Sequence, residues 1–81
     1  MNVEREAMRG RLAGLQDQRK KLNLRIEAAA RALRQGLNTA LTPVEELEVP
    51  QLAEQMDGLV MDWAELQKVL SDIARLEREL R

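Results

Sequence analysis

Carboxylates are the side chains of this sequence best suited to chemistry. Five of them stand close together in the middle of the chain: Glu45, Glu46, Glu48, Glu54 and Asp57. Converging carboxylates bind Mg²⁺ or Ca²⁺, and a pair of them can act as general acid and base. However, the segment lacks the glycine-punctuated loop of a calcium site, and acidic residues near the start of a helix are explained by the helix dipole. We therefore expect no metal ion here.

Other chemistry is limited by the residue types that are missing. The chain has no Cys and no His, which excludes zinc sites of the usual kind, disulfides, thiol nucleophiles and imidazole bases. Ser71 is the only serine and falls within an expected helix without a base beside it. The sequence contains no glycine-rich phosphate-binding loop. We expect no enzyme activity, no cofactor and no small-molecule substrate.

The elements that must position the side chains are two long helices. Apolar residues recur alternately four and three residues apart in both halves of the chain, which is typical of a coiled-coil seam. In a first helix expected over residues 3–36, the seam residues are Met8, Leu12, Leu15, Arg19, Leu22, Ile26 and Leu33. In a second helix expected over residues 50–80, they are Leu52, Met56, Leu59, Trp63, Leu66, Leu70, Ile73 and Leu80. Arg19 and Glu77 are the charged residues that interrupt this rhythm.

A bend over residues 37–49 is expected between the helices. Gly36 offers the left-handed residue with which many helices end. Thr42 and Glu45 have the spacing of a capping box, in which each side chain bonds to the other's backbone N–H, and Pro43 would stand at the first helical position.

Pro50 interrupts any helix that reaches it, because proline has no N–H to donate. Two alternatives remain open for this region. One is a short helical turn at about residues 43–48 followed by a new helix from Pro50, and the other is a single kinked helix from Pro43 onward.

The two halves of the chain carry opposite charge. Residues 1–36 hold nine Lys or Arg against four Asp or Glu, whereas residues 37–81 hold four against ten. Such complementarity selects a partner and an orientation more than it adds stability, because exposed pairs are each worth only about 0.5 kcal/mol. We therefore predict a single all-α domain, residues 1–81, folded as an antiparallel, coiled-coil-like helical hairpin.

The second helix carries apolar residues beyond its seam, and a hairpin alone has only one contact line to bury them. We expect Val60, Val69 and Leu76 to form an interface with a partner. The simplest closed assembly is a two-fold homodimer that makes an antiparallel four-helix bundle. There are two alternatives. One is a complex with another helical protein, and the other is a longer coiled coil in which the chain does not fold back on itself.

A basic face on the first helix is the other feature with functional meaning. Its residues are Arg9, Arg11, Lys20, Lys21, Arg25, Arg31 and Arg34. A basic helix is a common start of nucleic-acid binding, but no aromatic side chain stands among these residues to stack on bases. The acidic second helix would also neutralise part of this charge, so nucleic acid is the less favoured partner.

The sequence favours a helical interaction and oligomerisation module that works as an adaptor, assembly factor or regulator. A nucleic-acid-binding protein is the first alternative, and a chaperone-like hairpin that clasps a partner helix is the second. No apolar run approaches the roughly 20 residues of a membrane span, and no signal peptide is apparent, so we expect a cytoplasmic protein without membrane contact. In architecture alone, the pattern resembles many small bacterial and phage proteins.

Overall fold

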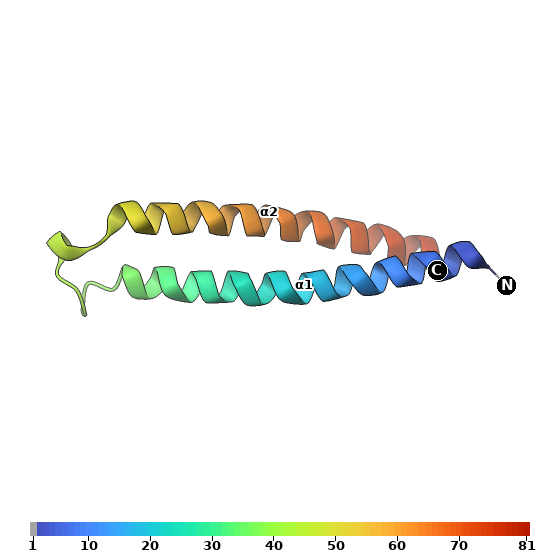
Figure 1. Ribbon diagram of the computed structural model, residues 1–81, viewed down its shortest axis with the longest axis horizontal. Coiled ribbons are helices and arrows are strands. Elements are labelled where there is room, and N and C mark those ends of the chain that lie inside the picture. The colour runs from blue at the N-terminus through green and yellow to red at the C-terminus, as the bar shows by residue number, and fades with distance from the viewer. Residues whose placement is uncertain (1) are drawn as a thin grey trace.

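The computed structural model describes residues 2–81, and over that range the chain is a hairpin of two antiparallel helices (Figure 1). Helix α1 spans Val3–Gly36 and helix α2 spans Val49–Leu80, with a short 3₁₀ helix, η1 (Val44–Glu46), in the bend. The helices lie side by side in a rod of 65 × 16 × 15 Å, with both termini at the same end. The predicted all-α helical hairpin is confirmed.

Helix α1 begins at a side-chain cap. The Asn2 side chain accepts a hydrogen bond of 3.1 Å from the backbone N–H of Arg5, which satisfies one of the free donors of the first turn. Glu4 and Glu6 stand in that first turn and Arg34 in the last turn, where their charges complement the helix dipole.

The end of α1 differs from the expected left-handed glycine. No residue in the range 2–81 has a positive φ, and the cap is Leu37, with φ −94° and ψ 4°. Gly36 is needed for space instead. A Cβ at this position would collide with the Leu52 side chain of α2, so the missing side chain lets the two helices approach each other beside the bend.

The bend does not use the predicted capping box. Pro43 is extended, with φ −57° and ψ 148°, and η1 has no side-chain cap. Asn38 organises the turn instead: its side chain accepts from the N–H of Ala40 at 2.9 Å, and its carbonyl accepts from the N–H of Thr42 at 3.2 Å. A capping box requires a full α-helical turn after the cap, and the chain makes only a 3₁₀ turn here.

Pro50 lies in the first turn of α2, where its missing N–H costs no helical hydrogen bond. Of the two alternatives for this region, the structure shows the separate turn followed by a new helix, and it does not show a kinked helix running from Pro43.

The core is a single line of side chains between the helices. Leu22, Val69 and Ile73 form its buried centre, against which the partly buried Leu12, Leu15 and Leu66 pack. Fully burying a side chain of this kind stabilises a protein by about 1.5–3 kcal/mol. At the end of the rod that holds the termini, the Arg5 guanidinium donates a hydrogen bond of 2.7 Å to the Leu80 carbonyl.

The seam of α1 lies where the sequence places it, with one exception. Leu22 and Leu33 are buried, and Met8, Leu12, Leu15 and Ile26 are half-buried. Arg19 was expected in the seam but is exposed. A guanidinium left between two apolar helices would have to be desolvated, whereas at the edge of the seam it stays in water.

The face of α2 that packs on α1 is rotated about the helix axis relative to the predicted face. Leu52 and Ile73 are buried, and Leu59, Leu66, Leu70 and Leu80 are half-buried, as the pattern predicts. Between them, however, α1 packs on Asp62, Val69 and Leu76, in place of the positions one residue later along the chain. Trp63 and Met56 were predicted in the seam and are instead 56% and 48% exposed.

Candidate functional site

An apolar groove runs between α1 and α2 on the side of the hairpin where Trp63 lies. It has a volume of about 270 Å³, and all six lining side chains are apolar: Ile26, Ala30, Met56, Leu59, Val60 and Trp63. Two of these residues come from α1 and the other four from the bend-proximal half of α2. Ligand and partner pockets are typically concave and predominantly apolar.

The groove follows from the turn of α2. Asp62 faces α1 and is half-buried, and the next residue of a helix points about 100° further round its axis, so Trp63 leaves the seam. Met56 lies two turns earlier on the same side as Trp63. The small side chain of Ala30 on α1 leaves the space that these two residues flank.

Polar contacts hold the other flank of the hairpin closed. The Arg25 guanidinium donates two hydrogen bonds to the Asp62 carboxylate, one of them at 3.4 Å, and Gln18 donates to Glu65 at 3.0 Å. The hydrogen bond to Asp62, and then the charge of Asp62, raise the pKa of Arg25 above its usual value. Asp62 and Glu65 of α2 are thus hydrogen-bonded to Arg25 and Gln18 of α1.

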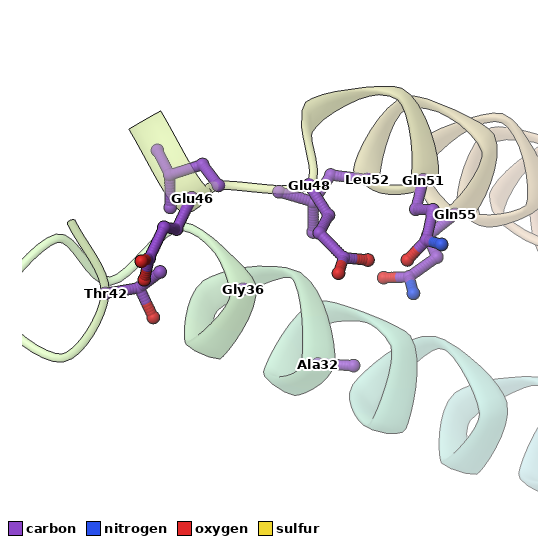
Figure 2. Close-up of a pocket in the computed structure, with 9 residues that line it drawn as sticks. Ala32, Gly36, Thr42, Glu46, Glu48, Gln51, Leu52 and Gln55 are labelled. Atoms are coloured by element: carbon purple, nitrogen blue, oxygen red, sulfur yellow. The ribbon is translucent and has the colours of Figure 1, made fainter. Parts of the chain in front are cut away.

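A second hollow, of about 310 Å³, lies where the bend meets the helices. Figure 2 shows Glu48, Gln51 and Gln55 extending from the start of α2 across this hollow toward α1, and Glu46 close to Thr42. Within residues 2–81, no three acidic side chains come close enough together to hold a metal ion. This hollow therefore brings carboxylates and amides together without a ligand set.

The predicted partner interface divides in two. Val60 is 52% exposed and lines the groove. Val69 and Leu76, by contrast, are only 3% and 1% exposed, because α1 packs directly on them. Their assignment to a partner surface is wrong, since both belong to the hairpin's own seam.

The seven basic residues of α1 that were predicted to contact nucleic acid are all exposed but do not share one side of the helix. At about 100° per residue, Arg11 and Lys21 lie on the side of Arg25, whereas Arg9 and Lys20 lie on the opposite side. Lys21 also pairs with Asp17 at 3.0 Å, and Arg25 is engaged by Asp62. Binding of nucleic acid by these residues, which include Arg31 and Arg34, stays a prediction.

Two features of the groove were missing from the sequence reasoning. Ala30 was not among the predicted site residues, and Trp63 was predicted in the seam between the helices. The signal available in the sequence was Glu77, since a seam that includes Trp63 and Leu70 must also include this carboxylate. Rotating α2 by one position places Leu76 in the seam instead of Glu77, and the same rotation exposes Trp63.

No helix within residues 2–81 is long and apolar enough to cross a lipid bilayer. No protein-family model, curated protein or solved structure matches the chain. The groove and the surfaces around it are therefore the features of this protein that bear on its function.

Proposed function

We propose that this chain is a non-catalytic helical interaction module, which serves as an adaptor, assembly factor or regulator by binding another α-helix. The observation that carries the proposal is the groove: six apolar side chains, three of them about half exposed, line one continuous depression. Apolar surface concentrated in one depression marks a contact site more strongly than the same residues scattered singly.

A helix is the occupant that fits best. The groove lies between two antiparallel helices whose axes run side by side. An amphipathic helix laid along such a groove buries one apolar stripe. Trp63 adds a large, rigid contact residue of the type that dominates interface energies, and Met56 adds a flexible one that adapts to the shape of its partner. A second copy of the chain and a different helical protein are both partners of this kind.

In-cell photo-crosslinking tests the proposal directly. A benzophenone amino acid at Val60 places the reactive group in the groove, and the same amino acid at Met61 is the matched control, because Met61 is 73% exposed but points about 100° away. We expect discrete protein adducts from position 60 and far fewer from position 61, detected by gel shift and mass spectrometry.

Equal labelling from both positions, or no protein adduct from position 60, would contradict the proposal. The rival function has its own signature in a DNA-binding assay at two salt concentrations. Binding to nucleic acid that weakens steeply with salt, without protein adducts in cells, would favour the basic residues of α1 instead.

A further inference from the structure

A second coiled-coil seam runs along the exposed side of α2. Over residues 49–74, every seventh residue forms one row, which consists of Val49, Met56, Trp63 and Leu70 and ends before Glu77. A parallel row, offset by four residues, consists of Ala53, Val60, Gln67 and Ala74. Together these rows, here called the outer seam, repeat the alternate spacing of four and three residues that lets one helix pack along another.

The outer seam is apolar and, apart from the half-buried Leu70, exposed. Gln67 is its only polar residue, and Val49, with 57% of its surface exposed, is as open as Trp63. The inner seam, centred on Leu66 and Ile73, is the one that α1 covers. Helix α2 therefore carries two adjacent seams, which is the arrangement of a helix with two helical neighbours in a bundle.

Helix α1 has no matching outer seam. The positions that flank its inner seam on the groove side are mainly polar and include Gln16, Asn23 and Glu27. The apolar surface available for pairing thus belongs to α2. Two-fold pairing uses the same patch on both copies, so the outer seam of one α2 matches the outer seam of another.

Resting on the proposed function, we propose that the groove binds a second copy of this chain, with the two α2 helices antiparallel about a two-fold axis between Val60 and Trp63. Counted outward from the axis, the layers pair Val60 with the partner's Trp63, Met56 with the partner's Gln67, Ala53 with the partner's Leu70, and Val49 with the partner's Ala74. Most layers join a larger side chain to a smaller one, as even packing requires.

Other arrangements pack less well. Parallel pairing in register puts Trp63 against the partner's Trp63 and Ala53 against the partner's Ala53, which crowds one layer and leaves another empty. Sliding the antiparallel pair by one heptad either sets Ala53 against the partner's Glu77 or leaves Leu70 beyond the start of the partner's α2. The proposed register covers the whole outer seam.

Charge favours the same orientation. The bend is acidic, with Glu45, Glu46 and Glu48, whereas residues 75–81 carry three arginines against two glutamates. Antiparallel pairing keeps the two acidic bends at opposite ends of the dimer, and parallel pairing brings them together. Exposed charges of this kind select orientation more than they add affinity.

The exposed area agrees with a dimer. The chain exposes 6374 Å², whereas a compact monomer of 9.3 kDa exposes about 5,000 Å². The excess, about 1,400 Å², exceeds the roughly 800 Å² that each partner buries in a stable interface of standard size. A second copy is therefore large enough to cover the surplus surface.

Disulfide trapping tests the register, because the natural chain contains no cysteine. Val49 and Ala74 are exposed in the hairpin, so Val49→Cys and Ala74→Cys leave their thiols accessible. A disulfide forms only where the two Cα atoms come within about 7 Å of each other. We expect rapid crosslinking when the two variants are mixed and little crosslinking of either variant alone. Leu24→Cys, on the outer face of α1, is the control for random collision when it is mixed with Val49→Cys.

Each other result overturns the inference. Rapid crosslinking of Val49→Cys with itself indicates parallel pairing. If Val49→Cys and Ala74→Cys crosslink no faster than Val49→Cys and Leu24→Cys, the proposed register is excluded. A chain that sediments as a monomer at all concentrations excludes the second copy. If the dimer tests fail but the photo-crosslinker at position 60 still captures a protein in cells, the proposed function stands without the homodimer. If the dimer tests fail and position 60 captures no protein, both proposals are wrong.

Discussion

The two ends of the hairpin are built from the same helices but pack differently. At the end near the termini, α1 covers Val69, Ile73 and Leu76 almost completely. At the end beside the bend, Met56 and Trp63 of the same helix are about half exposed, and the space beside them is a groove. The terminal half of α2 thus buries its apolar residues more completely against α1, and the bend-proximal half leaves more of them exposed.

The largest effect is expected from the buried core. Leu22→Ala removes a side chain that is 1% exposed from the centre of the core and should destabilise the hairpin by about 3 kcal/mol, because the helices cannot close the cavity. Thermal unfolding followed by circular dichroism measures the loss. Leu24→Ala, two residues away and exposed, is the control and should change stability by about 0.5 kcal/mol at most. Similar losses from both variants would contradict the face assignment.

Substitution in the groove should weaken association and leave the fold intact. Trp63→Ala removes the main contact residue of the groove, which should cost about 2 kcal/mol of binding, or roughly a thirtyfold rise in the dimer Kd. Sedimentation across a range of concentrations measures this change. Met61→Ala, on a different side of α2, should leave the Kd unchanged. A loss of helicity in dilute Trp63→Ala would place the tryptophan in the hairpin core after all.

Trp63 also reports on the assembly without a substitution, because the chain contains no other aromatic residue. Its indole is open in the separate hairpin and becomes covered in the proposed dimer. We expect its emission to shift to shorter wavelength, and its quenching by acrylamide to fall, as protein concentration rises. The melting temperature should rise over the same range, because the dimer stabilises the folded state by mass action. Constant emission at all concentrations would indicate an uncovered groove.

Glycine-to-alanine substitutions should change stability by a smaller amount, and the change should differ between the two ends of the hairpin. A Cβ at Gly10 or Gly14 meets no atom within 4 Å, so Gly→Ala there should stabilise the hairpin by about 0.5–1 kcal/mol through helix propensity. Gly36→Ala should lose this gain, since its Cβ displaces the Leu52 side chain. The three variants are compared by thermal unfolding. Equal gains from all three would show that the helices need no close approach at the bend.

The smallest effect is expected from the polar flank. Arg25→Gln removes the hydrogen-bonded ion pair with Asp62, but the Arg25 side chain is exposed, and water replaces most of what is lost. The melting temperature should fall less than in any core variant, and the difference should shrink further in high salt. A large, salt-independent loss would show that this pair fixes the rotation of α2 and thereby the position of the groove.

Much of the fold was readable from the sequence because it depends on local patterns. The heptad spacing predicts two long helices, and the opposite charges of the two halves predict that they fold back on each other. The α1 seam was predictable for the same reason: apart from Leu24, this helix has a single narrow apolar stripe, so periodicity leaves one choice of contact face.

The groove was not predictable in this way, because α2 has a wide apolar arc. Leu59, Leu66 and Ile73 form its central row, and apolar residues stand on both sides of that row. Periodicity alone does not decide whether Val69 or Leu70 turns toward α1. The heptad spacing favoured Trp63 as a seam residue, whereas in the structure Val69 and Leu76 are buried and Trp63 is exposed.

The sequence by itself determined two oppositely charged helices, the bend between them and the absence of Cys and His, because composition and helical period act within each segment of the chain. The rotation of α2 about its axis was decided only in the tertiary structure. There, contacts between residues distant in sequence, such as the burial of Val69 and Leu76 against α1 and the approach of Gly36 to Leu52, select one of two nearly equivalent faces. The face left over carries the groove, because a lone α1 cannot cover both sides of α2.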